Sequence, residues 1–334
     1  MTDLSICIPT YNRAAFIEET LWSVLAQADE KLEICLSDNA STDATVSIAH
    51  SVLAKFQNAR IAVAPVNRGA DANFLSAVAI ARSPYCLILG SDDTLAPQAI
   101  SRIRSVIANG NLDIVSFDRR MHTVTMRPIR TEHMRRNPLE RTFDFRRPAA
   151  LDEWLAGAQS LCAAFSYLSS AVFRKSAWDA VPDADRWLDS AYVHSYKLLS
   201  ACLGGAQMQY LPEPLVNCRI GNDSFRDRGL CQRMLIDLYA FARLAALVDR
   251  NGFSRAARHL RTLLRTEYPF WRIVRYQRLL SEDPQWKLAL DLLRREFGVP
   301  LPSLCLASLL GGIPGVARAS FMFRDSIQAI RCSR

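Results

Sequence analysis

The chain has 334 residues, half of them hydrophobic and 22% charged, which indicates a packed globular protein and excludes a largely disordered one. Its nine cysteines are scattered without a CxxC pair, which argues against a disulfide framework or a zinc site and favours free thiols in a reducing cytoplasm. The net charge of +8 is uneven, because residues 230–334 hold 17 Lys and Arg against 8 Asp and Glu.

The N-terminus has no basic segment followed by an apolar one, so a signal peptide is not expected and residues 4–9 read as a strand. The segment closest to a transmembrane helix is 299–317. It contains Pro300, Pro302 and Pro314, which interrupt the continuous hydrogen-bonded backbone that a spanning helix needs. A re-entrant or surface-lying segment remains an alternative there.

The first 118 residues alternate strand and helix patterns, which predicts a doubly wound, mostly parallel α/β sheet. In such sheets, ligands bind beyond the carboxyl ends of the strands. The strands are expected at 4–9, 32–37, 61–64, 85–89 and 114–117, and the helices at 16–27, 43–55, 72–81 and 97–108.

Residues 119–147 break this rhythm with nine arginines and no periodicity, and they are predicted to form a loop. That loop either closes over the active site or is a surface excursion. The pattern of the next segment is α+β, with strands at 168–173, 207–211 and 215–219 and a helix over 189–203. We expect one domain over 1–220, with halves 1–118 and 119–220, and a basic helical region over 221–334.

The C-terminal region contains an amphipathic pattern at residues 253–265, with apolar residues on one face and arginines on the other. A basic amphipathic helix can lie on an anionic membrane surface. The alternative is an ordinary surface helix packed on a core. Nucleic-acid binding is a weaker interpretation, since no recognised module accompanies the charge.

The first two strand ends carry polar residues. The first reads Pro9-Thr10-Tyr11-Asn12-Arg13 and lacks the glycine patterns of dinucleotide-binding and P-loop proteins, which argues against both. Asp38 ends the second strand, where it is expected to contact a ligand. Thr42 and Asp43 follow, and helix capping is the favoured interpretation for both.

The next two strand ends are also polar. Arg68, in Asn67-Arg68-Gly69, either faces a phosphate or lies in a plain loop. The fourth strand is followed by Asp92 and Asp93. Adjacent carboxylates repel each other unless a cation or hydrogen-bond donors compensate, and Mg²⁺ commonly bridges such groups to substrate phosphates. A solvated turn before the next helix is the alternative.

These four motifs, in this order and spacing over residues 4–118, resemble those of family 2 glycosyltransferases with the GT-A fold. Within that family, the sequence looks most like the abequosyltransferase-like branch, which acts in bacterial surface polysaccharide assembly. The resemblance implies a nucleoside diphosphate sugar donor and a divalent cation, Mn²⁺ or Mg²⁺.

The resemblance also implies roles for particular residues. Asp93 would bind the metal that bridges the diphosphate, Asp92 would lie near the ribose or the sugar, and Asp38 would contact the base. The remaining donor-binding residues are Pro9, Thr10, Tyr11, Arg13, Asn67 and Arg68.

The general base is less clearly marked. Many relatives carry an acidic pair where this chain has Val193-His194. His194 is the leading candidate, because its unperturbed pKa near 6.5 suits base catalysis, and Asp189 is the second. The predicted helix over 189–203 would put these two side chains on different faces. Trp178 and Trp187 could stack on a sugar, although core packing is the favoured interpretation for both.

The resemblance, together with the charge and cysteine patterns, predicts a cytoplasmic, metal-dependent glycosyltransferase, peripheral on the inner face of the plasma membrane, with a glycan or lipid-linked acceptor. One alternative is a nucleotidyltransferase, although the usual Gly-rich, Lys/Arg-bearing first loop is absent. The other is a non-catalytic scaffold of the same fold, which the missing acidic pair keeps open.

Overall fold

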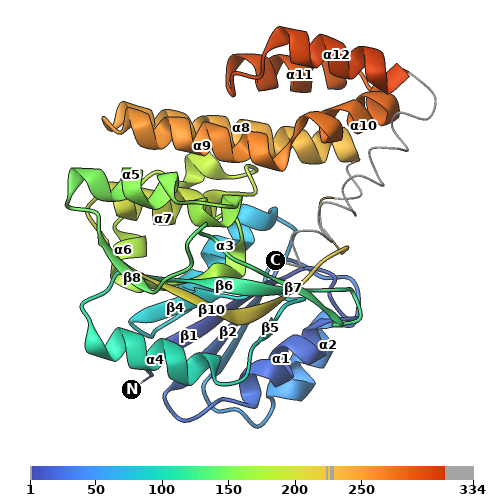
Figure 1. Ribbon diagram of the computed structural model, residues 1–334. Helices are drawn as coiled ribbons and strands as arrows, with labels where there is room; N and C mark the ends of the chain where they lie inside the picture. The colour runs from blue at the N-terminus through green and yellow to red at the C-terminus, as the bar shows by residue number, and fades with distance from the viewer. Residues whose placement is uncertain (1, 223–224, 226–228, 313–334) are drawn as a thin grey trace. The chain divides into compact units, whose positions relative to one another are not determined.

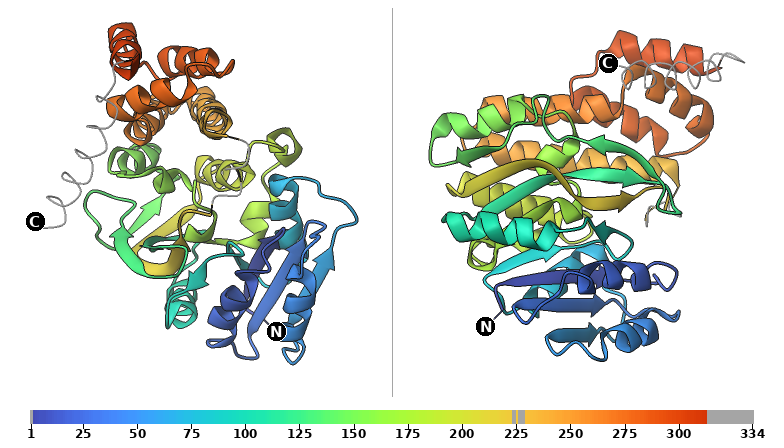
Figure 2. Two further views of the ribbon diagram at one scale, coloured as in Figure 1. Left: turned by 90° about the vertical axis from the view of Figure 1, so that its right-hand side faces the viewer. Right: turned by 60° about the horizontal axis from the view of Figure 1, so that its bottom comes forward.

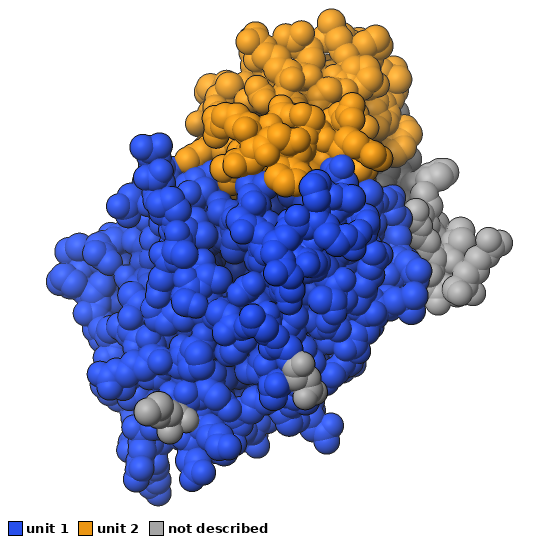
Figure 3. Space-filling view, turned by 90° about the vertical axis from the view of Figure 1, so that its left-hand side faces the viewer, with its two compact units in different colours: residues 1–223 blue, residues 224–334 orange. Residues whose placement is uncertain are grey.

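The computed structural model describes residues 2–222, 225 and 229–312. The chain divides into two compact units, residues 1–223 and 224–334, which Figure 3 distinguishes by colour. Within the described ranges, none of the helices has both the length and the apolar character needed to cross a membrane.

The first unit is built on one ten-stranded sheet. Eight of its strands follow the order β3-β2-β1-β4-β9-β6-β10-β5, and the other two, β7 and β8, pair with β6 and β10 respectively. Strands β3, β2, β1 and β4 are parallel, β9 is antiparallel to both of its neighbours, and β6 and β10 are parallel to each other. The strands are β1 (Leu4–Thr10), β2 (Leu32–Asp38), β3 (Ala59–Val63), β4 (Tyr85–Ile88), β5 (Thr94–Leu95), β6 (Ile114–His122), β7 (Pro128–Glu132), β8 (Arg141–Asp144), β9 (Ala171–Arg174) and β10 (Gln207–Arg219).

Helices cover both faces of this sheet (Figures 1 and 2). One face carries α1 (Ile17–Leu25), α2 (Thr45–Leu53) and α4 (Ala99–Asn109), and the other carries α3 (Ala70–Ala79), α5 (Pro148–Ala156), α6 (Lys175–Asp179) and α7 (Val193–Leu203). The predicted mostly parallel α/β sheet is therefore confirmed. Strands β1 and β2 are buried along their whole length, as expected for strands between two helical layers.

Strand register brings the polar strand ends together. Thr10 is paired with Asp38, and Cys7 with Ile88, so β1, β2 and β4 end at the same edge of the sheet. The loops that follow these three strands contain three of the four motifs found in the sequence, and the fourth motif follows β3, whose Val63 is paired with Asp38. This edge is therefore where the candidate site lies.

Four predictions about the second half of the unit are wrong in detail. Residues 119–147 are not a plain loop, because β6 runs on to His122 and β7 and β8 follow it. The expected strand at 168–173 starts with a 3₁₀ turn, η2 (Leu168–Ser170), before β9. The two strands expected around Pro212 and Pro214 form one strand, β10, whose register shifts at these prolines.

The fourth difference concerns the start of α7, which was expected at residue 189. Asp189 and Ala191 both have positive φ angles, 67° and 62°, which a right-handed helix does not contain. The helix therefore begins at Val193. Asp189 lies in the preceding loop, so the expected angle between Asp189 and His194 around a helix does not apply.

The described part of the second unit is helical, as predicted for the C-terminal region. The apolar face of the amphipathic segment predicted at 253–265 lies inside the unit, with Leu260 and Leu264 fully buried. The apolar residues of this helix are thus explained by packing within the second unit. The helices are α8 (Leu230–Arg250), α9 (Ser254–Glu267), α10 (Phe270–Leu280), α11 (Trp286–Arg295) and α12 (Leu301–Gly312).

Candidate active site

The loops after β1 and β2 are joined by hydrogen bonds between them. Asn12, with a φ of 50°, accepts a hydrogen bond at Oδ1 from Thr42 N (2.8 Å) and donates its own N–H to Ser41 Oγ (2.8 Å). Asp43 accepts a bond from Ala14 N at 3.0 Å and another from Thr45 N at the start of α2. Asp43 therefore caps α2 and holds the first loop, in line with the capping expected for it.

Asp38 also supports these loops. Its side chain is fully buried, and its two oxygens accept bonds from Ser41 N (2.8 Å) and Ser41 Oγ (2.5 Å). Both carboxylate oxygens of Asp38 thus hold the loop that follows β2. The contact with a nucleotide base expected of Asp38 stays a prediction.

Two of the three expected pocket residues at the end of β1 are buried. Pro9 and Thr10 lie inside the sheet edge, and the Thr10 carbonyl accepts a bond from Asn73 Nδ2 at 3.1 Å. Tyr11 is 41% exposed. Of the three, Tyr11 is the one whose side chain is open to a ligand.

The loop after β3 is held by the amide of Asn39, which follows β2. Asn39 donates to Asn67 Oδ1 (2.8 Å) and accepts from Arg68 N (2.9 Å). Asn67 also accepts a bond from Gly69 N at 2.9 Å. Arg68 is exposed, and its guanidinium donates to Ser76 Oγ on α3 at 3.1 Å. Asn67 thus shapes the loop, and Arg68 is a solvent-accessible cation on the same edge.

Asp93 is buried and surrounded by donors. Tyr167 Oη (2.5 Å) and Ser169 Oγ (2.7 Å) donate to Oδ2, and Arg219 N (3.1 Å) donates to Oδ1. Burial, together with the neighbouring charge of Asp92, raises the pKa of Asp93 to about 7. Burial also raises the pKa of Tyr167, which keeps its hydroxyl protonated as a donor. Both Asp93 oxygens are thus committed to protein donors.

Asp92 is the more open member of the pair, with 21% of its side chain exposed. Its Oδ2 accepts a bond from Asn222 Nδ2 at 2.6 Å and lies 3.7 Å from Arg13 Nε. Partial burial raises the pKa of Asp92, and the charges of Arg13 and Arg219 oppose this rise. Asp92 is therefore the more accessible carboxylate of the two, and the metal-binding role expected of Asp93 stays a prediction.

The two candidate bases differ sharply in environment. His194 is 3% exposed, lies edge-on to Phe74, and has no hydrogen-bond partner for either ring nitrogen among the described residues. Burial lowers the pKa of His194 to about 4, so its ring is neutral at physiological pH. The His194 imidazole is thus enclosed in this structure, and its role as the general base stays a prediction.

Asp189 is exposed and lies against the loop that follows β3. A methyl group added to Gly69 would lie 3.3 Å from Asp189 Oδ1. Gly69 has a φ of 85°, a conformation that favours glycine. The structure thus brings Asp189 to the same sheet edge as Arg68.

Asp71, in the first turn of α3, holds the loop that carries Asp189. It is buried, and its oxygens accept bonds from Ala191 N (2.7 Å) and Val193 N (3.0 Å) at the start of α7. Burial raises the pKa of Asp71, and these backbone donors oppose the rise. Sequence reasoning missed this residue, because its partners lie 120 and 122 residues further along the chain and only folding brings α3 to α7.

Other groups were also missed or placed differently. Tyr167 and Ser169 fell within or beside a predicted strand, so no signal marked them as partners of Asp93. Trp178 and Trp187 are both buried, stacked on Phe173 and Tyr196 respectively, which is the core packing expected for them.

A mostly parallel α/β sheet with an acidic pair at the carboxyl edge of its strands is the arrangement expected of a GT-A-type glycosyltransferase. The chain belongs to glycosyltransferase family 2, since residues 5–172 match the model of glycosyl transferase family 2. It is 36% identical over 250 residues to the abequosyltransferase RfbV of Salmonella typhimurium, covering 72% of this chain and 74% of that protein. This membership supports glycosyl transfer over the nucleotidyltransferase alternative.

Two solved structures share the fold at 18% identity. One is Staphylococcus aureus TarS 1–349 in complex with UDP-GlcNAc, with a TM-score of 0.63 over 96% of this chain and 88% of that one. The other is the mannosyltransferase PcManGT of Pyrobaculum calidifontis in complex with GDP-Man and Mn²⁺, with a TM-score of 0.52 over 96% and 83%. At this identity, the similarity to both structures shows a shared GT-A fold alone.

Proposed function

We propose that this protein transfers a sugar from a nucleoside diphosphate donor to a glycan acceptor during assembly of a bacterial surface polysaccharide. The observation that carries this proposal is the open carboxylate of Asp92 at the shared edge of β1, β2 and β4, in a chain similar to an abequosyltransferase over most of its length. Residues 1–118 form the donor half and residues 119–220 the acceptor half.

In this proposal, the donor lies along the loops after β1, β3 and β4. Tyr11 offers an exposed ring to the nucleotide, and Arg68 offers an exposed guanidinium to the diphosphate. Arg13 and Asp92 lie beside each other at the centre of this edge. Charge-assisted bonds from arginine to phosphate are stronger than neutral ones, so Arg13 and Arg68 would orient the diphosphate.

A divalent cation fits Asp92. The described residues contain no group of three His, Cys, Asp or Glu side chains suited to hold a metal ion by themselves. Mg²⁺, however, is often bound by one or two carboxylates together with substrate phosphates, and Asp92 supplies one such carboxylate. When bound, the cation would stabilise the charge that develops on the leaving nucleoside diphosphate. Asp93 would orient Asp92 and would not be a ligand.

Asp189 is the proposed general base. As an exposed carboxylate it can accept the proton of an acceptor hydroxyl, whose oxygen then attacks the anomeric carbon. The bond between that carbon and the phosphate oxygen breaks, and the nucleoside diphosphate leaves with the electron pair. A direct displacement of this kind inverts the anomeric configuration. Asp71 would hold the loop of Asp189 in place through its two backbone bonds.

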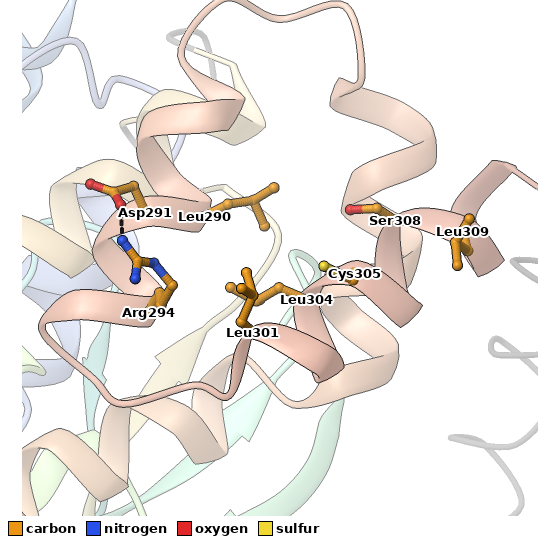
Figure 4. A pocket seen from close by; sticks show the side chains of 8 residues that line it. All are labelled: Leu290, Asp291, Arg294, Leu301, Leu304, Cys305, Ser308 and Leu309. Carbon is orange, nitrogen blue, oxygen red and sulfur yellow. Dashed lines mark hydrogen bonds and ion pairs between the residues drawn. The ribbon is translucent and has the colours of Figure 1, made fainter.

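The proposed acceptor is lipid-linked, and the second unit is proposed to bind the cytoplasmic face of the plasma membrane. Helix α12 exposes Leu301, Leu306 and Leu309, the last at 71%. An open cavity of about 610 Å³ lies between α11 and α12, with leucines on its wall and the Asp291–Arg294 ion pair at one side (Figure 4). Apolar side chains beside arginines suit an anionic lipid surface.

The test is donor breakdown by the purified protein. It would be incubated with UDP-, GDP-, CDP- and dTDP-sugars, an abequosyl donor among them, with Mn²⁺ or Mg²⁺ and with EDTA. We expect one donor to release its nucleoside diphosphate, and EDTA to suppress that release. Turnover unchanged by EDTA would contradict the cation dependence.

The scaffold alternative gives a different result in the same assay. A non-catalytic protein would bind a donor by calorimetry and leave it intact even with lipid-linked glycan acceptors present. Absence of binding to every donor would contradict the proposed function itself. Asp189→Asn should retain donor binding and lose transfer, whereas a base elsewhere would leave transfer intact.

A further inference from the structure

Arg219, the last residue of β10, is a buried cation beside the acidic pair, and the proposed mechanism gives it no direct task. Its side chain is 3% exposed, so it cannot itself bind a donor phosphate. Its Nε donates to the main-chain carbonyl of Asp92 at 2.8 Å, and its backbone N–H donates to Asp93 Oδ1 at 3.1 Å. Arg219 is thus hydrogen-bonded to both Asp92 and Asp93.

The guanidinium is itself held on three sides. It donates to Glu19 on α1 at 2.5 Å and to the Val124 carbonyl in the β6–β7 connection, and it lies 4.8 Å from the centre of the Phe16 ring. Because the planar guanidinium has five N–H donors in fixed directions, these partners fix its position as well as its charge. The group therefore ties β10, α1 and the β6–β7 hairpin to the turn after β4.

The segment just after β10 also contacts Asp92, at its side-chain carboxylate. Asn222 donates to Asp92 Oδ2 at 2.6 Å. The backbone of Asp92 is thus fixed by Arg219 and its side chain by Asn222. Adjacent carboxylates beside an anionic diphosphate repel each other and the ligand, and a buried cation reduces that repulsion.

We propose that Arg219 is a positioning residue, which sets the orientation of Asp92 and so determines how tightly the site binds the donor diphosphate. This inference rests on the proposed function, because it assigns the donor to the same edge. Arg219 acts through Asp92 and Asp93 and does not contact the substrate.

The test compares Arg219→Met and Arg219→Lys with a matched control, Arg104→Met. Arg104 also makes short ion pairs with two carboxylates, Asp3 (2.9 Å) and Asp29 (2.6 Å), but these precede β1 and β2 at the opposite edge of the sheet. Both methionine variants lose a paired arginine. Of the two methionine variants, Arg219→Met alone should alter the donor site.

The readouts are calorimetric binding of the nucleoside diphosphate identified with the wild-type protein, steady-state KM and kcat for its sugar donor, and the melting temperature. We expect Arg219→Met to weaken nucleotide binding at least tenfold, to raise KM and to lower kcat. Arg219→Lys should restore part of the binding, since an ammonium keeps the charge but not the planar set of donors. Arg104→Met should lower the melting temperature and leave nucleotide binding within about twofold, in keeping with a contribution through stability alone.

Equal nucleotide binding by the wild type and Arg219→Met would overturn the inference. If the methionine variant does not fold, a folded Arg219→Lys that binds and turns over donor as the wild type does would overturn it equally. A wild type that binds no donor refutes the proposed function, and that result is distinct from an active wild type with an unaffected Arg219 variant.

Discussion

At the scale of single residues, the two neighbouring acids of the candidate site have different surroundings. Asp93 is enclosed by three donors, whereas Asp92 is partly open and faces Arg13. An amino-acid sequence presents them as an equivalent pair. Only the folded structure shows that the Asp92 carboxylate is partly open and that the Asp93 carboxylate is enclosed.

Replacing the open carboxylate should affect chemistry more than folding. We expect Asp92→Asn to lower kcat/KM by a factor of about 100 or more, as when one preorganised charge-stabilising group is removed. Its melting temperature should stay near that of the wild type, because Asn222 can still bond to the remaining carbonyl oxygen. Steady-state kinetics with the identified donor checks this. Near-normal turnover in this variant would contradict the assignment of Asp92.

Asp93 should make stability depend on pH in a defined direction. Its pKa is about 7 in the folded protein, and about 3.9 is expected for an unfolded aspartate. Between these values the folded state holds a proton that the unfolded state has lost. The contribution of Asp93 to stability is therefore fully present below about pH 4 and is lost as the pH rises through about 7.

Urea unfolding of the wild type and Asp93→Asn from pH 4 to pH 8 measures this effect. We expect the free energy of unfolding of the wild type, relative to that of the variant, to fall across this range. A difference that does not change with pH would mean that Asp93 is ionised throughout.

At the scale of elements, the junction between α3 and α7 connects the donor loops to the proposed base. Asp71, in the first turn of α3, accepts two backbone N–H groups at the start of α7, and the preceding loop places Asp189 beside Gly69. The positive φ angles of Asp189 and Ala191 make this loop compact. A negative charge at a helix N-terminus is also favourable, because it opposes the helix dipole.

Removing the Asp71 carboxylate should loosen this junction. We expect Asp71→Ala to reduce the free energy of unfolding by about 1–3 kcal/mol, since two backbone donors lose their partner. It should also lower kcat while changing donor binding little, because Asp189 moves but Asp92 does not. Chemical unfolding and donor calorimetry provide the measurements.

Asp113→Ala is a suitable control for this junction. Asp113 also accepts a backbone bond, from Gln207 N at 2.9 Å, but it precedes β6 at the other edge of the sheet. The control variant should lose stability without the loss of kcat. Equal kinetic effects in both variants would argue against a special role for the α3–α7 junction.

At the scale of the whole molecule, the two units have different surfaces. The basic excess lies in the residues after 229, and exposed leucines gather on α12 of the second unit. The arginine-rich amphipathic segment at α9 has its apolar face inside that unit, whereas α12 exposes three leucines and α10 exposes Trp271 and Leu279.

Binding to lipid vesicles tests this surface. We expect the wild type to sediment with vesicles that contain phosphatidylglycerol and to be released by salt, because the attraction is partly electrostatic. The double variant Leu306→Glu/Leu309→Glu should bind less. The control Leu139→Glu changes a similarly exposed leucine of the first unit and should bind as the wild type does. Equal vesicle binding by all three proteins would contradict membrane docking through α12.

The sequence alone determined the α/β fold, the family resemblance and the edge of the sheet that carries the candidate site. These follow from local periodicity and from polar residues placed directly after buried strands, and both are properties of short segments. The surroundings of each candidate residue were decided by tertiary structure. Asp38, Asp93 and His194 carry the residue types that the chemistry needs, yet burial and hydrogen bonding engage or enclose them.

Asp71, Tyr167 and Arg219 matter for the opposite reason. The hydrogen bonds described for them join residues between 74 and 200 positions apart in the sequence, as the bonds of Tyr167 to Asp93 and of Arg219 to Glu19 illustrate. No local pattern encodes such pairings, because hydrogen bonds and charge interactions depend on distances that exist only after the strands and helices have packed. The sequence thus supplies the types of functional group at the candidate site, while the contacts and the exposure of each group depend on the fold.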